Sequence, residues 1–438
     1  MREWQIDALG SIASIRRGIG YSEATLEENR EDGSPYLNMK SFIKDGGYNK
    51  KGLKFFSGHF TKSDVTTVND LIIANTDVTP GGDIIGVPAL LPKALASDTV
   101  LFSHHVTRLH INGQIETPFL YYLLCTDRYR RSMRKYARGT TVQMLDMAGI
   151  KRIPVSYPKS RNVQQQIIAI LTTIDTAIEQ TEALIEKYQH IKAGLMHDLF
   201  TRGVLPTGQL RPPREHVPEL YKETAIGWIP REWQTGQIGT YFEIQLGKML
   251  NQLARTGRNS FPYLGNRSVQ WNRLQMDNLE SMDFSPEEQK KFALKDGDLL
   301  VCEGGEVGRT AIWASQMENC FYQKAIHRLR GKHEGINPRF MLWYMHVAQA
   351  NGQFSDFTSQ SSIAHLTQEK LAKVPALLPP TPEQDLIVSC IDAHETVVEG
   401  QRDYLANLRA QKLGLMQDLL TGKVAVNVNA EAVGDTSG

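Results

Sequence analysis

The sequence predicts an α+β fold in which two tandem mixed α/β domains are separated by two long antiparallel coiled-coil helices. The two halves of the chain are related by an internal pseudo-two-fold repeat. Three observations support this prediction. The chain of 438 residues repeats itself once along its length. Each copy contains short apolar strands bounded by turn signals, and each copy ends in a long heptad pattern. A prior of about 150 residues per domain also suggests two to four domains.

The repeat consists of strings that recur in the same order. The longest string, Lys192-Ala-Gly-Leu-Met-His-Asp-Leu-Phe-Thr201, returns 220 positions later as Lys412-Leu-Gly-Leu-Met-Gln-Asp-Leu-Leu-Thr421. Other matched pairs are Arg2-Glu-Trp-Gln5 with Arg231-Glu-Trp-Gln234, Pro35-Tyr-Leu37 with Pro262-Tyr-Leu264, and Gly81-Gly-Asp83 with Gly304-Gly-Glu306. A gene duplication without functional meaning would also produce such matches. However, the copies diverge inside the globular parts and little at the helix ends, which favours one scaffold with two different recognition surfaces.

Short elements are expected in both globular parts. Residues 70–74 and 298–302 are apolar runs beside Asn-Asp, Asp-Gly-Asp and Gly-Gly signals, which predicts buried strands. Residues 118–124 and 338–345 begin with proline, which is favoured in a first helical turn, and both segments are predicted to be helices. The segment 304–310 has the wrong spacing for a phosphate-binding loop and no lysine, so it is predicted to be a glycine-rich turn after a strand.

Two long segments carry the heptad pattern of a coiled coil. We call the stripe of side chains that should face the partner helix the seam. In the first copy the predicted seam comprises Val163, Ile167, Ile170, Ile174, Ala177, Thr181, Leu184, Tyr188, Ile191 and Leu195. In the second copy it comprises Ile387, Ile391, His394, Val398, Gln401, Leu405, Leu408, Lys412, Leu415 and Leu419. An antiparallel pair of about 40 residues would form a spacer of roughly 60 Å, whereas two separate helices packed on their own domains are the alternative.

These elements divide the chain into six parts. The predicted parts are a first recognition domain at 1–155, a first spacer helix at 156–203, a linker at 204–225, a second recognition domain at 226–377, a second spacer helix at 378–424 and a frayed tail at 425–438. The linker is rich in proline, glycine and charge, so it is expected to be extended on the surface.

Composition excludes several classes of protein. The formal net charge is +1, from 49 Lys+Arg and 48 Asp+Glu, so a nucleic-acid surface would have to be a local patch. Four cysteines lie far apart without a CxxC pair, which favours a reducing compartment over a disulfide framework. Neither a membrane span nor a signal peptide is visible, so the chain is expected to be soluble and cytoplasmic.

Signatures of catalysis are lacking in the sequence. GxSxG, HExxH and the Asn/Asp-Pro-Pro-Tyr/Phe string of amino-methyltransferases do not occur. Asp283 with Glu288-Gln-Lys290 could form a nuclease-like set, but such combinations are common on polar surfaces. His104-His105 has no third ligand at a plausible spacing, so a polar contact in a loop is expected in place of a metal site. The chain is therefore predicted to be non-catalytic by itself and to hold neither a metal nor a cofactor.

Clustered cations provide the positive signal in the first copy. Arg128, Arg130, Arg131, Arg134, Lys135 and Arg138 lie within eleven residues, and four of them are expected on one helical face. Guanidinium arrays beside small hydroxyl residues suit a phosphate backbone. The predicted DNA-binding residues are Arg128, Arg131, Arg134, Lys135, Arg138, Thr140 and Thr141. A solvated helix face is the alternative.

In the second copy the cations come earlier in the domain. The corresponding segment 352–362 has no cation, although Ser361-Ser362 align with Thr140-Thr141. The cations are Lys248, Arg255, Arg258, Arg267 and Arg273, interleaved with Asn266, Gln270, Trp271 and Asn272. Arginine binds guanine edges and asparagine or glutamine binds adenine edges, so this mixture suits a DNA groove. The predicted DNA-binding residues are Lys248, Asn266, Arg267, Gln270 and Arg273.

Together these features resemble the specificity subunit of type I restriction–modification systems. The resemblance rests on the alternation of two divergent domains with two similar helices, and on the Lys-x-Gly-Leu-Met-x-Asp-Leu-[FL]-Thr helix ends. It also rests on Arg211-Pro-Pro, on Thr224-Ala-Ile-Gly-Trp-Ile-Pro-Arg-Glu-Trp233, and on Pro379-Pro380 followed by Glu383-Gln384. It covers the chain apart from the tail. The first copy departs from the pattern, because Val163-Gln164 lacks the glutamate.

The resemblance implies a DNA sequence-recognition subunit in which each globular domain reads one half of a split target in double-stranded DNA. The helical pair would set the gap and dock two modification subunits, which bring S-adenosylmethionine and methylate adenine. Restriction subunits would join to translocate and cut DNA with ATP and magnesium. Apolar helix ends suit such docking, namely Leu195, Met196, Leu199, Leu415, Met416 and Leu419, although they could also be core.

Two other functions remain open from the residues alone. A duplicated coiled-coil scaffold that binds protein partners would show a similar basic face, and an autonomous nuclease would need a metal-carboxylate site. Salt-dependent, sequence-selective DNA binding separates the first of these from a specificity subunit.

Overall fold

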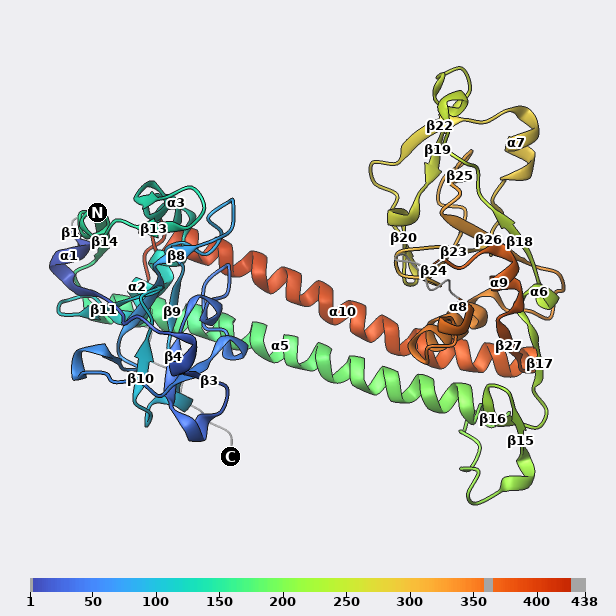
Figure 1. The fold of residues 1–438 in the computed structure, drawn as a ribbon, viewed down its shortest axis with the longest axis horizontal. Coiled ribbons are helices and arrows are strands. Elements are labelled where there is room, and N and C mark those ends of the chain that lie inside the picture. The colour runs from blue at the N-terminus through green and yellow to red at the C-terminus, as the bar shows by residue number, and fades with distance from the viewer. Residues whose placement is uncertain (1–2, 358–364, 427–438) are drawn as a thin grey trace. The chain divides into compact units, whose positions relative to one another are not determined.

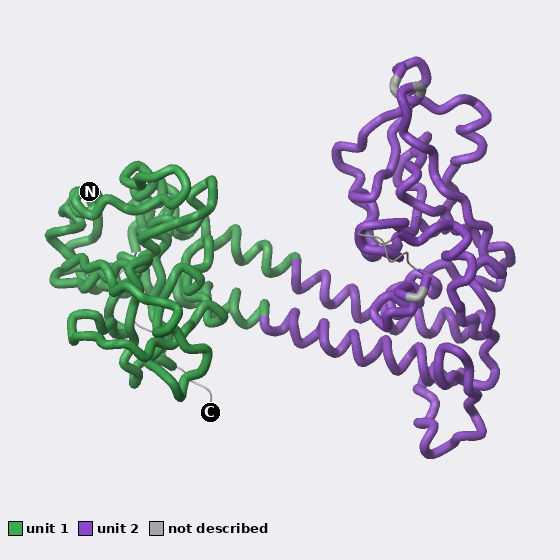
Figure 2. Tube along the Cα trace, in the orientation of Figure 1, with its two compact units in different colours: residues 1–182, 403–438 green, residues 183–402 purple. Residues whose placement is uncertain are grey.

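The computed structural model describes residues 3–357 and 365–426, except for the side chains of Leu253, Arg255 and Asp356. The chain divides into two compact units (Figure 2). Unit 1 contains Met1–Glu182 and Asp403–Gly438, and unit 2 contains Ala183–Arg402. Each unit therefore contains one globular part and a stretch of both long helices. Most of the predicted tail, residues 427–438, lies outside the described residues.

The centre of unit 1 is an antiparallel sheet with the strand order β2-β11-β7-β9. Strands β11 and β9 of this sheet are labelled in Figure 1. Its strands are β2 (Ala13–Arg17), β11 (Val106–Ile111), β7 (Leu71–Ala74) and β9 (Pro88–Leu90). All four residues of β7 are buried, which confirms the strand predicted at 70–74. Helix α2 (Thr117–Cys125) begins with a proline in its first turn, as predicted, and packs on β7 and β9.

Smaller sheets surround this centre. A five-stranded sheet has the order β3-β5-β4-β10-β6, with β3 (Leu26–Glu27), β5 (Lys54–Phe56), β4 (Ser34–Leu37), β10 (Val100–Phe102) and β6 (Val65–Thr66). A three-stranded sheet joins β12 (Ala137–Arg138), β13 (Gln143–Leu145) and β8 (Thr76–Asp77), and β1 (Trp4–Ala8) pairs with β14 (Pro154–Pro158). The remaining short helices are α1 (Leu9–Ile12), α3 (Asp127–Lys135) and α4 (Met147–Lys151).

Unit 2 repeats the central sheet in the order β18-β26-β23-β24. Its strands are β18 (Phe242–Leu246), β26 (Ile326–Gly331), β23 (Leu299–Cys302) and β24 (Thr310–Ile312). The predicted strand at 298–302 is confirmed as the buried strand β23, and the predicted helix at 338–345 is confirmed within α8 (Pro338–Ala350). Residues 303–309 form the predicted glycine-rich turn, with positive φ at Gly305 and Gly308.

Unit 2 contains further strands and helices. The strands are β15 (Tyr221–Thr224), β16 (Gly227–Pro230), β17 (Gln234–Gln237), β19 (Ser260–Leu264), β20 (Val269–Gln270), β21 (Arg273–Leu274), β22 (Glu280–Asp283), β25 (Phe321–Tyr322) and β27 (Pro375–Leu378). The helices are α6 (Ile238–Tyr241), α7 (Pro286–Lys291) and α9 (Gln368–Lys373). Strand β17 pairs with β27, as β1 pairs with β14 in unit 1.

The same main-chain hydrogen bonds occur in both globular parts. The amide of Gly18 donates to Val106 O at 3.1 Å, and the amide of Gly247 donates to Ile326 O at 3.0 Å. A Cβ at Gly18 would clash with the carbonyl oxygen of Phe102, and one at Gly247 would clash with that of Gln323. Glycine is therefore required at both positions, because the main chain of another segment passes too close for a Cβ atom. The two sequence copies thus fold to one topology with matched positions.

The long helices are α5 (Arg161–Thr201) and α10 (Thr381–Leu419). They run antiparallel within each unit. In unit 1, Lys412 Nζ lies 2.6 Å from Asp175 Oδ1, and Arg409 Nη2 lies 2.6 Å from Glu182 Oε1. In unit 2, Lys192 Nζ lies 2.5 Å from Glu395 Oε2. No helix among the described residues is long and apolar enough to span a membrane.

The seam predicted in α10 is confirmed, and the seam predicted in α5 is wrong at two of its ten positions. Every residue of the seam predicted in α10 is buried or half-buried. In α5, the predicted residues Ile170 and Ile191 are 36% and 44% exposed, whereas Leu171 and Ile185 are buried in their place. The other eight predicted residues, including Ile167 and Ile174, are buried or half-buried. Adjacent apolar residues along α5 permit either choice, and packing selects one set.

The helix ends predicted to dock partner subunits are instead part of the cores. Met196 and Leu199 are 4% and 1% exposed in the core of unit 2, where Leu195 packs against the same cluster. Met416 and Leu419 are 7% and 5% exposed in the core of unit 1, where Leu415 packs. Four of the six predicted side chains are therefore buried inside the chain and cannot form an exposed docking face, whereas Leu195 and Leu415 are half-buried.

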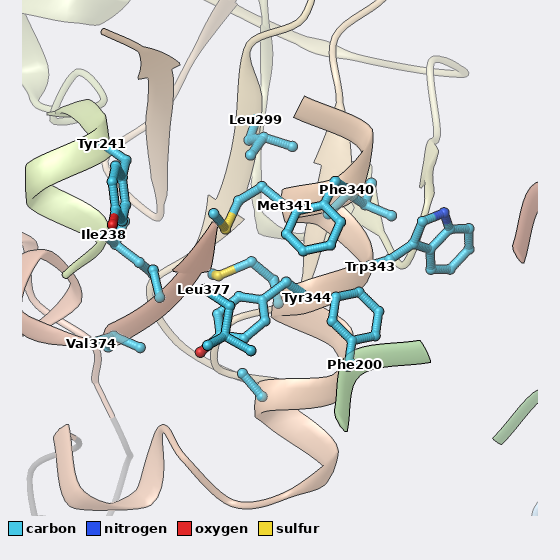
Figure 3. Packing of buried hydrophobic residues seen from close by; sticks show 14 of the residues in the cluster. Phe200, Ile238, Tyr241, Leu299, Phe340, Met341, Trp343, Tyr344, Val374 and Leu377 are labelled. Carbon is cyan, nitrogen blue, oxygen red and sulfur yellow. The ribbon is translucent and has the colours of Figure 1, made fainter. Parts of the chain in front are cut away.

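Aromatic side chains lie together where α5 meets α8 in the core of unit 2 (Figure 3). Phe200 of α5 packs on Phe340 of α8 with ring centroids 5.2 Å apart, beside Trp343 and Tyr344. Helix α8 therefore binds the end of α5 on one side and the central sheet on the other, where it contacts β24. The recurring helix-end string is explained by this packing.

The predicted linker is only partly a surface segment. Val204 and Arg211 are 2% and 5% exposed, and Val204 pairs with Leu210 in an isolated bridge. The later residues form a β15–β16 hairpin. This segment is therefore fastened to unit 2 by buried side chains, which its polar composition did not predict.

Candidate nucleic-acid interface

Helix α3 presents most of the predicted cations of unit 1. Arg128, Arg131, Arg134 and Lys135 are exposed. Arg130, in the same cluster, is 8% exposed and donates to the carbonyl oxygens of Ile85 and Asp83 at 2.7 and 2.8 Å. The helix is therefore pinned by one internal arginine while its other cations face outward.

Arg138 does not belong to the helical face on which it was predicted. Helix α3 ends at Lys135, and Arg138 lies on strand β12, where its guanidinium is 2.9 Å from the carboxylate of Asp146. Its side chain remains 80% exposed. The tip of the β12–β13 hairpin follows, with Gly139 at φ 107° and with Thr140 and Thr141 exposed. These hydroxyls are accessible, as a phosphate contact requires.

A glycine-rich loop, residues 75–86, links these segments; we call it the first glycine loop. Its buried anchor is Asp77, which accepts from the amides of Thr79, Ile84 and Ile85 at 2.7, 2.6 and 3.2 Å. Burial alone would raise the pKa of Asp77, but these N–H donors together outweigh it, so the pKa lies below its usual range. A stable carboxylate therefore fixes the loop on which α3 and β13 converge.

In unit 2 the predicted recognition residues lie on a turn and a two-stranded hairpin. Arg267 is exposed on the single 3₁₀ turn η9 (Asn266–Ser268), and Arg273 is exposed on β21. Gln270 is half-buried on β20 and donates to Arg267 O at 2.9 Å. Strands β20 and β21 pair as a hairpin whose turn includes Asn272 at φ 57°. Arg267, Gln270 and Arg273 are therefore brought together.

Two residues predicted in this group are engaged internally. Lys248 Nζ lies 2.5 Å from Glu288 Oε2 and donates to Asp283 O at 2.6 Å, with its side chain only 12% exposed. Asn266 Nδ2 donates to Gly304 O at 3.1 Å. Asn266 Oδ1 is buried without a hydrogen-bond partner among the described residues. Their roles as DNA contacts are therefore corrected to internal roles.

The nuclease-like set is part of the same internal arrangement. Asp283 accepts from Thr256 Oγ1 and from the amides of Gly257 and Asn259, which lower its pKa. Burial alone would raise the pKa of Glu288, but the hydrogen bonds from Lys248 and Ser285 outweigh it. These carboxylates serve the fold. Arg258 is exposed, whereas the side chain of Arg255 lies outside the described residues.

The β20–β21 hairpin is braced against α8. Trp271 Nε1 donates to Glu306 Oε1 at 2.5 Å, and its ring lies 4.7 Å from that of His346 in an edge-on arrangement. Arg339 Nη1 donates to Asn272 Oδ1 at 3.2 Å. Glu306 belongs to residues 303–309, which we call the second glycine loop. The hairpin is thus held beside this loop.

Histidine and cysteine residues form no candidate metal centre. Among the described residues, no group of three or more His, Cys, Asp or Glu side chains could hold a metal ion. The predicted polar contact of the histidine pair is confirmed, because His105 Nδ1 lies 2.7 Å from Thr76 Oγ1. Burial, with the charges of His104 and Arg17, lowers the pKa of His105 to about 4. All four cysteines are free.

The two domains share one topology, and each has exposed cations beside a glycine-rich loop, so the fold defines a tandem-domain protein with two candidate surfaces for nucleic acid. A family model described as "Type I restriction modification DNA specificity domain" matches residues 1–188 and 230–405. The match covers most of the chain, so the chain belongs to the family of type I restriction–modification specificity subunits. Its function is DNA target recognition, together with other subunits of such a system. The prediction of a non-catalytic recognition subunit agrees with this family, and the scaffold alternative is not favoured.

Two relatives match most of the chain. The MjaVIII specificity subunit of a type I restriction enzyme from Methanocaldococcus jannaschii is 22% identical over 438 residues, 98% of this chain and 94% of the relative. A putative MjaX specificity subunit from the same organism is 23% identical over 319 residues, 72% of this chain and 69% of the relative. These names agree with the family assignment.

Solved structures share the fold. An S subunit of a type I system from M. genitalium superposes with a TM-score of 0.54 at 15% identity, covering 95% of this chain and 96% of that one. A second structure, from work on complex assembly and conformational transition of a type I system, gives a TM-score of 0.58 at 16% identity, covering 97% and 99%. The fold comparison therefore includes both globular parts and both long helices.

Proposed function

We propose that each globular part reads one half of a split target in double-stranded DNA. The recognition domains are residues 1–155 and 226–377. The observation that carries this proposal is the matched topology of two domains whose exposed surfaces differ in sequence, within a family defined by DNA specificity. One scaffold with two surfaces is suited to two unlike half-targets. The helices at 156–203 and 378–424 set the gap between the half-targets.

The proposed partners are two modification subunits, joined by restriction subunits. In this assembly S-adenosylmethionine is supplied by the modification subunits, and ATP and magnesium serve the restriction subunits. The chain itself contributes recognition and no cofactor. The complex acts where the DNA is, in the cytoplasm.

A different helix face replaces the docking residues that proved to be core. Gly194 of α5 and Gly414 of α10 occupy the same place in the repeat, and both are exposed, with no described atom within 4 Å of an added Cβ. Glycine inside a helix costs about 1 kcal/mol relative to alanine. A repeated exposed glycine is explained if a partner backbone approaches there. We assign one modification subunit to each of these two positions.

Methylome sequencing tests this proposal. A host that expresses the chain with its modification subunit should carry methyladenine in both halves of one split motif. Replacing residues 1–155 by the first domain of another specificity subunit should change one half of the motif and leave the other unchanged. Chain-dependent methylation without a split motif, or a swap that changes both halves, would contradict the assignment of one half-target to each domain.

A further inference from the structure

The residues predicted to contact DNA in the two units do not lie at matched positions. In unit 2 they lie on η9 and the β20–β21 hairpin, whereas in unit 1 they lie on α3 and the β12–β13 hairpin. Because the two globular parts share one hydrogen-bond pattern, the position in unit 1 that matches Arg267 can be found from main-chain contacts alone.

The match of η9 in unit 1 is the 3₁₀ turn η3 (Met39–Ser41). The amide of Asn38 donates to Ser41 Oγ at 3.0 Å, just as the amide of Gly265 donates to Ser268 Oγ at 3.2 Å. The amide of Ser41 donates to Asn38 O at 3.0 Å, and that of Ser268 donates to Gly265 O at 2.9 Å. These paired contacts place Lys40 at the position of Arg267.

The match of the β20–β21 hairpin is the turn formed by residues 42–48. Phe42 bridges Tyr48 as Val269 pairs with Leu274. After each turn the chain returns to the same partner, because the amide of Asn49 donates to Ser41 O at 2.9 Å and that of Gln275 donates to Ser268 O at 2.8 Å. Ile43, which follows Phe42, therefore takes the place of Gln270, which follows Val269.

Each turn also contacts an acidic residue of its own glycine loop. Lys44 Nζ lies 3.1 Å from Asp83 Oδ2 in the first glycine loop. In the second, Glu306 accepts from Trp271 Nε1. Since Arg130 of α3 donates to Asp83 O, the 42–48 turn and α3 border the same loop. The turn is therefore adjacent to the cations already predicted in unit 1.

The exposed chemistry of the turn suits DNA. Lys40 and Arg267 are both exposed, and neither belongs to an ion pair among the described residues. Lys50 and Lys51 are exposed on η4 (Lys50–Gly52), which packs on η3. Ile43 is 48% exposed. An apolar side chain can contact the methyl group of thymine, and a glutamine can bind the edge of adenine.

We infer that Lys40 contacts the DNA backbone and that Ile43 helps to select a base in the half-target of unit 1, the roles predicted for Arg267 and Gln270 in unit 2. The inference rests on the proposed function. It adds a turn that clustered charge did not reveal, because the turn itself has only one lysine. The different side chains at the matched positions, Ile43 and Gln270, give the two domains different base preferences.

The test compares four variants in the complete complex with its modification subunits. Ile43→Gln should change or relax the preference at one base position in one half of the split motif, and Gln270→Ala should do so in the other half only. Lys40→Gln should weaken binding to the cognate duplex by about tenfold without changing the motif, and should lower the salt slope by about one. Arg267→Gln should weaken binding on the other side in the same way.

Matched controls come from the same unit. Ile6→Gln alters an isoleucine on β1 that is 68% exposed, and it should leave the motif unchanged. Lys151→Gln alters an exposed lysine on α4 that matches Ala372 in unit 2, and it should leave affinity unchanged. Circular dichroism of each variant verifies folding.

The outcomes separate the inference from the function on which it rests. If the unaltered complex shows no split motif, the proposed function fails, and the inference fails with it. If the unaltered complex shows the motif but Ile43→Gln and Lys40→Gln behave as their controls do, the inference alone is overturned. An effect of both Ile43→Gln and Gln270→Ala on the same half would overturn it as well.

Discussion

Arg211 and Glu383 form a buried, two-pronged ion pair, although 172 residues separate them in the sequence. Their side chains are 6% and 7% exposed, and Arg211 Nη2 donates to Glu383 Oε2 at 2.9 Å. Glu383 also accepts from the amide of Val204 at 2.9 Å. The pair fastens the segment after α5 to the first turn of α10 inside unit 2. Val163 occupies the matching place in the first copy.

Removing one partner of this pair should be costly. Arg211→Met leaves Glu383 charged and buried, so we expect the free energy of unfolding of unit 2 to fall by about 3–5 kcal/mol. Combining it with Glu383→Val, the residue of the first copy, should restore most of that loss. Arg214→Met, at an arginine whose side chain is 41% exposed, is the control. Calorimetry measures the shift, and a double variant as unstable as the single one would contradict this account.

Asp77 should make the first glycine loop sensitive to acid. Asp77→Asn removes a carboxylate that accepts three amide hydrogen bonds, so unfolding should become easier by about 1–3 kcal/mol at neutral pH. The pKa of Asp77 is lowered in the folded chain, so its stabilising effect is complete above the unfolded pKa of about 3.9 and is lost as the pH falls below it. Urea unfolding should therefore show the variant and the unaltered chain converging in acid. Asp83→Asn, which breaks only a surface pair, should show a small effect at every pH.

The exposed face of α3 should bind phosphates. Arg131→Ala with Lys135→Ala should weaken DNA binding and lower the salt slope by about two, while assembly with the modification subunits is retained. Arg130→Ala should act differently, because it removes hydrogen bonds to the first glycine loop and lowers stability. A salt series of binding with the assembled complex measures both. Unchanged affinity of the double variant would remove α3 from the DNA footprint.

The exposed helix glycines should govern assembly. Gly194→Arg and Gly414→Arg should each reduce binding of one modification subunit, because a long side chain blocks close approach of a partner. Gly400→Arg is the matched control, since Gly400 is also exposed in α10 but has Gln180 at the corresponding place in the first copy. Sizing of the complex after mixing gives the number of bound subunits. Loss of binding by the Gly400 variant alone would reverse the assignment.

The fold was largely predictable because its signals repeat. Buried strands such as β7 and β23 appear as apolar runs between turn residues, and the prolines that begin α2 and α8 mark helix starts. The error in the α5 seam had a remedy in the sequence. The two copies are offset by 220 residues, so Ile391 and Leu405 of the α10 seam correspond to Leu171 and Ile185. These are the residues that are buried in α5. A heptad pattern alone cannot choose between neighbouring apolar residues, whereas a second copy can.

The candidate site was less predictable because the sequence does not show which atoms a charged side chain contacts. Arg130 and Lys248 look like their exposed neighbours in sequence, yet one binds carbonyl oxygens of the first glycine loop and the other binds Glu288. Those contacts join residues that are 40 or more positions apart. For the 42–48 turn, a signal did exist. The shared Pro-Tyr-Leu strings at 35–37 and 262–264 align it with the β20–β21 hairpin, but its composition is too ordinary to attract notice.

The 42–48 turn and the β20–β21 hairpin are closed by main-chain contacts. Their amides and carbonyls bond to fixed neighbours such as Ser41 and Ser268, so exposed side chains such as Ile43 carry little of the folding energy. Substitutions of exposed side chains such as Ile43 should be almost neutral for stability. Genes for such subunits could therefore acquire new half-targets by single-codon substitutions. Selection on these substitutions would act on self-protection of the host genome and hardly at all on whether the protein folds.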